Sequence, residues 1–546
     1  MTTLGDTFNL IDQPWIPVRS IDGRSREVSI GELFTEAPVI RAVGGDIPTQ
    51  AFAIQRVLLA IVRRAIDWSE DPVRRWGELW RAGEFPRAEV ESYLRTVHHR
   101  FDLLDTVAPF YQVADLQTAA GVFKPVDLLI ADRPTGAKYF TTRAGAGAQR
   151  LSLAEAARWV VHCQAFDPSG IKTGDLRDPR TKDGKGYPIG IAWCGQLGGV
   201  LLEGSNLFET MMLNTVLRNT NGTATWPSDV PVWERTHPEV GERDDTAPLG
   251  PCDVLTWQSR RIKLQHDGKF VNGAIVGNGD RISPHNRQDI EFCTAWRHSE
   301  PQSKQFGETR YLPAQFDPDR SLWRGIEGLL ADIPSQDGKP APRLAPGVVN
   351  WIDYLVAEKL LDRSVRIRPH ALALQYTNAW TPKPNGVVAS IDDALQIKVA
   401  LIGRRSQPRV FANRAVQAAN DSATALANLA GNLAEAAGGN AQLRKATARA
   451  AAYFALDAPY RQWVADLDED TDLEEHCAQW QRQVREIIGA NGRDLISSAG
   501  KSAWKGRMLG QRLLDSSLAS KYFWSALRSA LPAAFDTEPP QEGEQQ

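Results

Sequence analysis

The character of the chain changes near residue 405, after which strong helix formers dominate almost to the end. Alanine and leucine have high helix propensity, and apolar residues recur there at helical spacing. We expect short breaks between helices at Gly438-Gly439-Asn440 and around Pro459. Amphipathic helices joined by short loops pack as a bundle. The sequence therefore predicts a four-helix bundle over residues 386–535, followed by an acidic, proline-containing tail at 536–546 that is disordered.

The preceding residues, 1–385, mix helix and strand patterns. The opening FNLIDQPWIPVRS and REVSIGELF predict two strands around a turn at Asp22-Gly23-Arg24, then a helix with Ser29 as its N-cap. Helical spacing of apolar residues predicts a buried helix over Phe52–Trp68, and the segment LAEAARWVVHCQAF predicts another. The whole chain is thus of the α+β class, with a large mixed α/β N-terminal domain before the bundle.

Composition limits the cellular setting and the possible partners. No run of about 18 apolar residues is present to cross a bilayer, the N-terminus lacks the features of a signal peptide, and the five cysteines are far apart. We therefore expect a cytoplasmic protein without membrane contact. The net charge of −3 and pI near 6.4 do not indicate a nucleic-acid binder. Any such role depends on local basic segments.

Catalytic motifs are missing. The chain has no G-x-x-x-x-G-K-[ST] phosphate loop, no G-x-S-x-G elbow and no pair of cysteines at zinc-ligand spacing. His266-Asp267 is the pair most open to a metal-hydrolase interpretation, but it precedes Gly268 in a predicted turn, and such sites need further His or Asp ligands held on helices. We expect no enzyme activity, metal or cofactor, with a metal-dependent nuclease at His266 and Asp267 as the alternative.

Three loop regions combine glycines with Lys or Arg, namely 136–152, 167–187 and 266–287. Glycine lets a main chain approach a groove or phosphate closely, and cationic side chains neutralise phosphates. This combination favours nucleic-acid contact. Each loop taken alone is equally compatible with an ordinary solvent-exposed connection.

Two short motifs carry a resemblance to a known family. Leu10-Ile11-Asp12-Gln13-Pro14-Trp15-Ile16-Pro17-Val18 and Ala108-Pro109-Phe110-Tyr111-Gln112 resemble the N-terminal strand and the [HA]-P-F-x-Q element of the CasA family, the large subunit of the type I-E CRISPR Cascade complex. Length, motif order and the helical C-terminal end also match. The resemblance covers essentially the whole chain.

The resemblance implies a function and a set of partners. A member of this family recognises the protospacer-adjacent motif (PAM) in double-stranded DNA, starts strand separation for R-loop formation and recruits a helicase-nuclease, while guide pairing reads the sequence. The implied partners are the other Cascade subunits, the 5′ region of the CRISPR RNA (crRNA), target duplex with PAM, the displaced non-target strand and the helicase-nuclease effector. Some relatives hold a four-cysteine zinc knuckle, and its absence here implies no zinc.

The resemblance also implies site residues. The family's flexible loop near the crRNA matches Phe140, Thr141, Thr142, Arg143 and Arg150, and its glycine loop matches Ser169, Gly170, Ile171 and Lys172, without a run of consecutive glycines. The minor-groove lysine matches Lys269, with Arg281 as a rival. The wedge that splits the first base pair matches the hairpin tip at Gln375, Asn378, Ala379 and Trp380, although no Asn-Gln-Ala run stands there.

In the predicted bundle, cationic side chains offer positions that guide the displaced strand or contact neighbouring subunits, with solvated helix faces as the alternative. They are Arg404, Arg405, Arg409, Arg414, Lys501, Lys505 and Arg507. A third interpretation of the whole chain is a purely structural scaffold subunit whose loops contact only protein.

Overall fold

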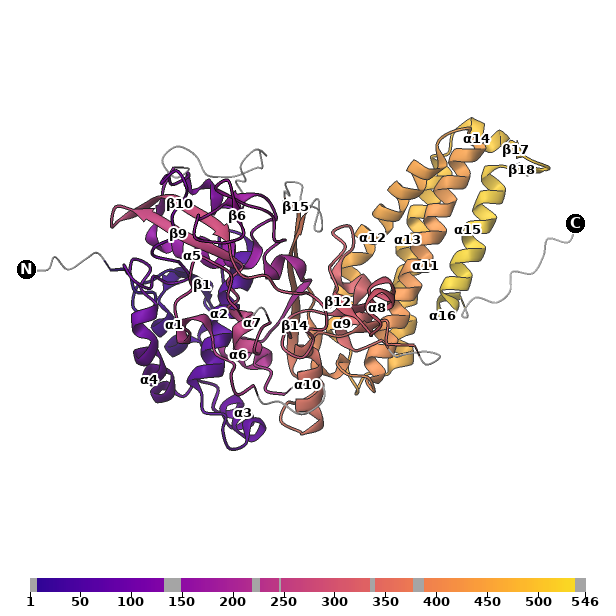
Figure 1. Cartoon of the computed structure of the whole chain (residues 1–546). Coiled ribbons are helices and arrows are strands. Elements are labelled where there is room, and N and C mark those ends of the chain that lie inside the picture. Colours follow the sequence, from indigo (N-terminus) through magenta and orange to yellow (C-terminus); the bar gives the residue numbers. More distant parts are fainter. Residues whose placement is uncertain are drawn as a thin grey trace, which may run out of the picture. The chain divides into compact units, whose positions relative to one another are not determined.

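The computed structural model describes residues 7–131, 149–218, 226–244, 247–333, 339–376 and 387–535 (Figure 1). The chain divides into two compact units. The first comprises Met1–Arg320, Ala331–Leu361 and Ile367–Ala394, and the second Ser321–Leu330, Asp362–Arg366 and Leu395–Gln546. The main boundary lies after Ala394 rather than after residue 385, and two short segments of the middle region belong to the second unit. The tail proposed at 536–546 lies outside the described residues.

The start of the chain folds as its sequence predicts. Strands β1 (Ile16–Ser20) and β2 (Ser25–Val28) pair antiparallel, with Ile16 opposite Val28, around a turn in which Gly23 has φ 87°. Helix α1 (Ile30–Glu36) follows, and Ser29 and Glu32 form a reciprocal capping box at its N-terminus. Glycine suits this turn because it adopts positive φ without a steric penalty.

Helix α2 (Pro48–Ala65) is the buried helix of the first unit. It begins earlier and ends earlier than the predicted Phe52–Trp68, because Pro48 occupies its first turn, where a missing N–H costs nothing. Its Arg56 forms a buried two-point ion pair with Glu291, with nitrogen–oxygen distances of 3.0 and 2.8 Å. The Trp193 indole also donates to Glu291, at 2.7 Å. Three segments far apart in sequence therefore meet at one buried carboxylate.

Helices α4, α5, α6 and α7 of the first unit pack against α2, as Figure 1 shows for the region around it. Helix α5 positions the site described below, and its N-terminus has a second capping box, between Ser152 and Glu155. The helices are α3 (Pro72–Ala82), α4 (Arg87–Val97), α5 (Leu153–Phe166), α6 (Leu207–Asn214), α7 (Pro251–Leu255), α8 (Glu300–Phe306) and α10 (Gly347–Ala357).

The strands of the first unit form several small sheets instead of one large sheet, in the orders β2-β1-β3, β4-β10-β9, β12-β11-β13 and β5-β7-β6; β14 pairs antiparallel with both β15 and β8. The further strands are β3 (Ile40–Val43), β4 (Leu151–Ser152), β5 (Lys172–Thr173), β6 (Thr181–Lys182), β7 (Lys185–Gly186), β8 (Gly199–Glu203), β9 (Arg260–His266), β10 (Phe270–Asn278), β11 (Trp296–His298), β12 (Tyr311–Pro313), β13 (Arg343–Leu344), β14 (Arg366–Tyr376) and β15 (Val387–Ala394).

The second unit is dominated by four long helices, as predicted. They are α11 (Gln407–Ala436), α12 (Ala441–Ala465), α13 (Leu473–Ser497) and α15 (Ser516–Ala530). Shorter elements accompany them: α9 (Glu327–Leu330), β16 (Ile397–Lys398), α14 (Lys501–Lys505), β17 (Arg507–Leu509), β18 (Arg512–Leu514) and α16 (Pro532–Phe535). Among the described residues, no helix is long and apolar enough to span a membrane.

One predicted break in the bundle is wrong. Gly438, at φ 80°, and Asn440, which caps α12, separate α11 from α12 as expected, but Pro459 lies inside α12. Interior proline costs one backbone hydrogen bond. Buried Leu456 and Tyr460, both 0% exposed, flank it. Their tertiary packing outweighs the local cost, and the next break falls instead between Ala465 and Leu473.

The Arg56–Glu291 pair gives a stability prediction. Replacing Arg56 by Leu leaves Glu291 buried without its countercharge, and breaking such a pair typically costs about 3–5 kcal/mol of unfolding free energy. The measurement is urea unfolding of the full chain followed by tryptophan fluorescence. Arg74→Leu is the control, because the Arg74–Glu78 pair is exposed and its loss leaves the unfolding curve nearly unchanged. Equal curves for the two variants contradict the prediction.

Candidate nucleic-acid interface

The glycine loop begins where α5 ends, at the buried residue Asp167. Its carboxylate forms ion pairs with Lys172 and Arg260. The Arg260 guanidinium also donates to the carbonyl oxygens of Asp167 at 3.1 Å and of Gly190 at 2.9 Å. Burial alone raises the pKa of Asp167, but the two cations outweigh burial and lower it. Asp167 therefore stays ionised and fixes the glycine loop to β9.

The four proposed glycine-loop residues differ in accessibility. Ser169 is buried at 5% exposure, and the Lys172 side chain is 15% exposed, with its ammonium on Asp167. Ile171 is 59% exposed. A Cβ atom added to Gly170 meets nothing within 4 Å. Gly170 and Ile171 thus form the accessible part of the loop, and Lys172 serves as an internal anchor.

A small basic hairpin follows the glycine loop. Strands β6 and β7 pair Lys182 with Lys185 around Asp183 (φ 51°) and Gly184 (φ 70°), the geometry of a type I′ turn. Both lysines are exposed, and so is Tyr187, at 52%. These three side chains were absent from the predicted site. The Asp-Gly pair between lysines was the available signal, because Asp-Gly is a strong hairpin marker.

Strands β14 and β15 form an antiparallel hairpin (Figure 1). Gln375 lies half-buried on β14 opposite Ala389. The buried hydroxyl of the next residue, Tyr376, donates to the carbonyl oxygen of Phe166, which directly precedes Asp167. The last described pair of the hairpin, Tyr376 with Val387, is therefore tied to the start of the glycine loop. The other proposed wedge residues, Asn378, Ala379 and Trp380, lie outside the described residues.

The β9–β10 hairpin presents Lys269 at its exposed turn. The Asp267 carboxylate accepts from the backbone N–H of Lys269 at 2.9 Å and of Phe270 at 2.7 Å, which shapes the turn. Ser152 of strand β4 pairs with Phe270. The Arg150 guanidinium lies 4.1 Å from the centre of the Phe270 ring. Arg150 and Lys269 are thus neighbours. The loop residues proposed with Arg150, namely Phe140, Thr141, Thr142 and Arg143, lie outside the described residues.

Arg281 lies near the opposite end of β10 from its rival Lys269. The nine residues of β10 place its two ends about 25 Å apart. The small β5-β7-β6 sheet packs at the Arg281 end, where Asn278 donates to the Tyr187 carbonyl at 2.6 Å. The Arg281 guanidinium is held by hydrogen bonds of 3.0 Å to both carboxylate oxygens of Glu242, and Glu242 also pairs with Arg180 at 3.3 Å. The glycine loop therefore shares its end of β10 with Arg281.

Groups suited to metal catalysis do not converge in the described part of the chain. No three His, Cys, Asp or Glu side chains lie there in a group that could hold a metal ion. The Asp267 carboxylate accepts hydrogen bonds from the backbone of the adjacent turn. All five cysteines are buried, and burial raises the pKa of Cys194 to about 12. The thiolate that nucleophilic catalysis needs is therefore disfavoured at Cys194.

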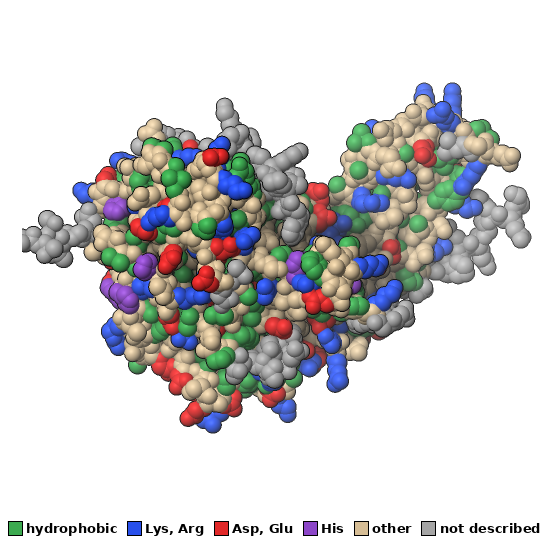
Figure 2. Space-filling view, viewed as in Figure 1, with side chains coloured by type: hydrophobic (Ala, Val, Ile, Leu, Met, Phe, Trp, Pro, Cys, Tyr) green, Lys and Arg blue, Asp and Glu red, His purple; other side chains and the backbone are tan. Residues whose placement is uncertain are grey.

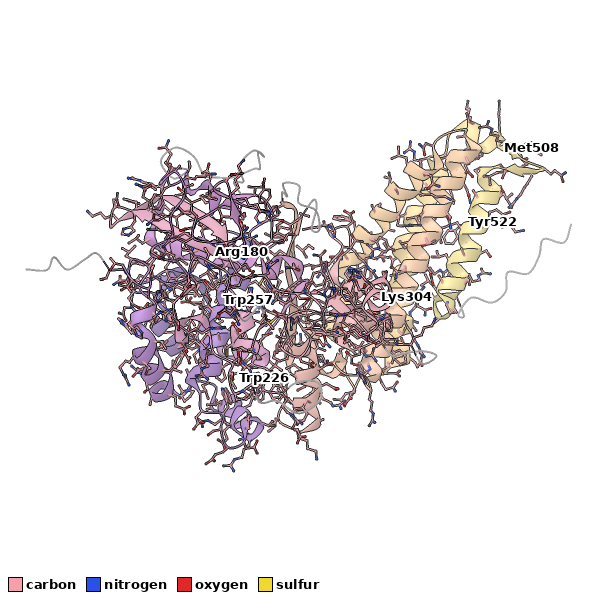
Figure 3. All side chains as sticks on the ribbon, viewed as in Figure 1. Arg180, Trp226, Trp257, Lys304, Met508 and Tyr522 are labelled. Carbon is pink, nitrogen blue, oxygen red and sulfur yellow. The ribbon has the colours of Figure 1, made fainter. Side chains whose placement is uncertain are left out.

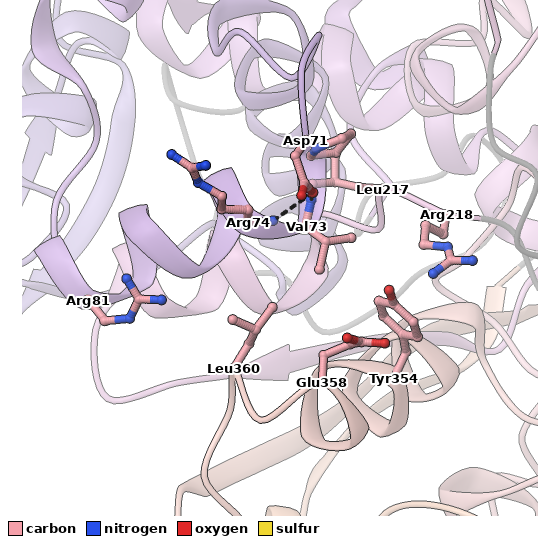
Figure 4. A pocket seen from close by; sticks show the side chains of 10 residues that line it. Asp71, Val73, Arg74, Arg81, Leu217, Arg218, Tyr354, Glu358 and Leu360 are labelled. Carbon is pink, nitrogen blue, oxygen red and sulfur yellow. Dashed lines mark hydrogen bonds between the residues drawn. The ribbon is translucent and has the colours of Figure 1, made fainter.

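A pocket of about 510 Å³ lies between α3 and α10 (Figure 4). Arg81, Arg218 and Glu358 line it together with Tyr354, over whose ring the Arg218 guanidinium lies at 4.4 Å. Asp71, also in the lining, caps α3 by accepting from two backbone N–H groups. The lining contains no His or Cys. It presents no nucleophile with an adjacent base, which is the arrangement that covalent catalysis requires.

The surface of the first unit mixes charges. On the face in Figure 2, Lys and Arg side chains alternate with Asp and Glu instead of forming one basic stripe, in keeping with the net charge of −3. Any nucleic-acid contact on this face would therefore depend on local cationic groups.

Comparison with known proteins identifies the family. The family model described as CRISPR-associated protein Cse1 matches residues 9–490. The chain belongs to the Cse1 family. A curated Cse1 relative, CasA/Cse1 of Thermus thermophilus, is 31% identical over 349 residues, which are 62% of this chain and 62% of that relative's length.

Solved structures agree with the Cse1 assignment. The crystal structure of Thermobifida fusca Cse1 matches with a TM-score of 0.89 and 41% identity, covering 96% of this chain and 98% of that chain. A chain of a solved CRISPR RNA-guided surveillance complex matches with a TM-score of 0.57 at 18% identity, covering 90% of this chain and 99% of that one, which shows a shared fold. The mixed α/β region with a C-terminal helical bundle is thus the Cse1 fold.

The anchoring of Lys172 gives a second stability prediction. Lys172→Met removes one of two cations from buried Asp167, and we expect a loss of about 1.5–3 kcal/mol of unfolding free energy, the usual worth of a hydrogen bond to a charged group. Lys182→Met removes the same charge from an exposed position and leaves stability unchanged. Urea unfolding of the full chain measures both. If both variants match the wild type, Lys172 is not an internal anchor.

Proposed function

We propose that this chain is the non-catalytic, DNA-facing large subunit of a crRNA-guided surveillance complex. In this proposal it recognises the PAM in double-stranded DNA, helps to open the duplex for R-loop formation and recruits a helicase-nuclease that cuts. Its partners are the other Cascade subunits, the crRNA 5′ region, the target duplex and the displaced strand. The setting is cytoplasmic. Membership of the Cse1 family supports this proposal.

One geometric observation carries the proposal. The glycine loop starts at Asp167, and the β14–β15 hairpin is tied by Tyr376 to the residue before it. A loop that binds the minor groove and a hairpin that parts the adjacent base pair must act on neighbouring nucleotides. A shared anchor keeps the two at a constant separation. The unstacking cost of a few kcal/mol per base step is then offset by contacts made to the same stretch of DNA.

The remaining site residues take distinct roles in the proposal. Gly170 and Ile171 lie against the minor groove, with Ser169 and Lys172 holding the loop from inside. Gln375, Asn378, Ala379 and Trp380 form the wedge. Lys269 is the proposed minor-groove lysine, presented at the β9–β10 turn. Arg150, with Phe140, Thr141, Thr142 and Arg143, serves the crRNA side. Arg281, paired with Glu242 and 60% exposed, stays the rival of Lys269 for the minor-groove contact.

The two other candidate functions have less support. A nuclease centred on His266 and Asp267 lacks a third ligand among the described residues. A pure scaffold does not require Gly170 and Ile171 to be exposed on a loop whose other residues are anchored so firmly. Cleavage of DNA by the purified chain with Mg²⁺ or Mn²⁺, abolished by His266→Ala, would favour the nuclease.

Gly170 allows a clean test of the proposal. The affinity for PAM duplex is measured for three forms of the assembled complex. They contain the wild-type chain, lack this chain, or contain the Gly170→Val variant. Because an added Cβ at Gly170 meets open space, the variant folds normally but holds DNA away from the loop. We expect the affinity for PAM duplex to fall about tenfold, or ~1.4 kcal/mol, and to fall further without the chain.

Gly500→Val is the matched control, since Gly500 also faces open space but lies at the start of α14. Duplexes with and without the PAM are titrated in the same buffer, and melting temperatures confirm folding. If the complex binds and opens PAM duplex equally well with and without this chain, the proposal is wrong.

The basic hairpin gives a test of phosphate contact. Each phosphate contact contributes about 0.9 to the slope of log K against log salt concentration for B-DNA. We expect Lys182→Gln with Lys185→Gln to lower this slope by up to about 1.8, measured by fluorescence anisotropy over a salt series. Lys304→Gln, on exposed α8 (Figure 3), serves as the control. An unchanged slope in the double variant excludes the hairpin from the interface.

A further inference from the structure

His370, in the middle of β14, links three strands through both nitrogens of its ring. Its Nδ1 lies 2.7 Å from Glu203 on β8, and its Nε2 lies 2.6 Å from Asp392 on β15. The register places His370 opposite Leu201 and Ala394, so that both carboxylates are diagonal neighbours on one sheet face. The His370 and Glu203 side chains are 16% and 12% exposed. We call these three side chains the strand clamp.

The geometry of the strand clamp specifies the charge of the imidazole. An ionised carboxylate only accepts hydrogen bonds, so a ring nitrogen at this distance from one must carry a proton. With a carboxylate at each nitrogen, both donate, and the ring is an imidazolium. Arg368, 3.4 Å from Glu203, supplies a second positive charge, and Arg41 also acts on Glu203. The imidazolium, Arg368 and Arg41 therefore place three cations around the two carboxylates of the clamp.

The strand clamp is sensitive to pH in one direction. Burial alone lowers the pKa of His370, but hydrogen bonds and charges from Glu203 and Asp392 outweigh burial and raise it above 6.5. A group whose pKa is raised by folding stabilises the fold fully below its unfolded value. That stabilisation is lost as the pH rises through the folded value. The clamp is therefore closed at pH 6.5 and weakens on the alkaline side.

The position of the clamp suggests its purpose. Strand β14 is tied to β8 and β15 at His370 and to the end of α5 at Tyr376. A strand held at two points cannot pivot about either one. We infer that protonated His370 is a positioning residue that fixes the β14–β15 hairpin against β8, so that the hairpin delivers its effect on duplex opening from a rigid base. The link to duplex opening rests on the function proposed above.

The first arm of the test needs only the full chain. Wild type and His370→Gln are unfolded thermally from pH 6 to 9.5, and the ring is titrated by NMR with [¹³Cε1]histidine. We expect the wild type to be more stable at pH 6.5 and the difference to shrink as the pH rises. Glu203→Gln with Asp392→Asn should shift the His370 pKa downward. A constant difference across the range, or a His370 pKa at or below 6.5, overturns the clamp.

The second arm measures duplex opening in the assembled complex, with 2-aminopurine beside the PAM. We expect the duplex-opening rate of the wild type to fall several-fold from pH 6.5 to 9. The rate of His370→Gln should be low and nearly independent of pH. The affinity for PAM duplex should change little in either case. His98→Gln is the matched control, because His98 also pairs with a carboxylate, Asp12 at 2.7 Å, outside this sheet. It should keep the wild-type pH profile.

The two arms separate the inference from the proposed function. If the first arm succeeds but His370→Gln opens DNA like the wild type at every pH, the positioning role is wrong and the proposed function stands. If the wild-type complex shows no PAM-dependent opening, the proposed function fails together with the positioning role, and the first arm decides whether the clamp exists.

Discussion

The charged contact on which the candidate interface depends is the buried ion pair between Asp167 and Arg260. It joins the end of α5 to the first residue of β9, and the same guanidinium holds the carbonyl oxygens of Asp167 and Gly190. Lys172, the last of the four glycine-loop residues, adds a second cation. A buried carboxylate with two cations is costly to disrupt, because removal of either partner type leaves uncompensated charge in the interior. Both ends of the loop are therefore held at the Asp167 carboxylate, because the loop starts at Asp167 and Lys172 at its other end pairs with the same group. The accessible residues between them have a rigid support.

Local sequence signals predicted the elements that depend on local chemistry. The capping residue Ser29, the turn at Gly23 and the apolar spacing of α2 and α5 are short-range features, and the structure confirms them. The Pro459 break was wrong because packing around Leu456 and Tyr460, contributed by residues distant in sequence, outweighs a local penalty. The main unit boundary at Ala394 and the transfer of Ser321–Leu330 to the second unit likewise depend on tertiary contacts. The spacing of apolar residues along the sequence reports local structure and does not reveal such contacts between distant segments.

The candidate site illustrates the same limit. A basic residue beside glycines resembles a phosphate ligand. In the structure, however, Lys172 forms an ion pair with Asp167, and Arg281 forms one with Glu242. Sequence alone could not distinguish them from Lys182 and Lys185, which are exposed at a tight turn. The difference arises from partners located elsewhere in the chain. It also explains how a protein with a net charge of −3 can offer cationic groups at specific points, since other arginines and lysines, such as Arg260 and Lys172, are paired with acids of the same chain.

The sheet containing β14 extends this use of paired charge from support to control. At Asp167 the carboxylate is buried and its pKa is lowered, so the anchor is insensitive to pH near neutrality. At His370 the titrating group is the cation, and its pKa is raised from a value already close to neutrality. Both devices rely on opposite charges in contact, with Asp167 buried and His370 16% exposed between Glu203 and the more exposed Asp392. They differ in which partner can lose its charge under physiological conditions. The ion pairs of Asp167 therefore hold the glycine loop across the physiological pH range. The contacts of His370 with Glu203 and Asp392, which hold the hairpin, weaken as the pH rises.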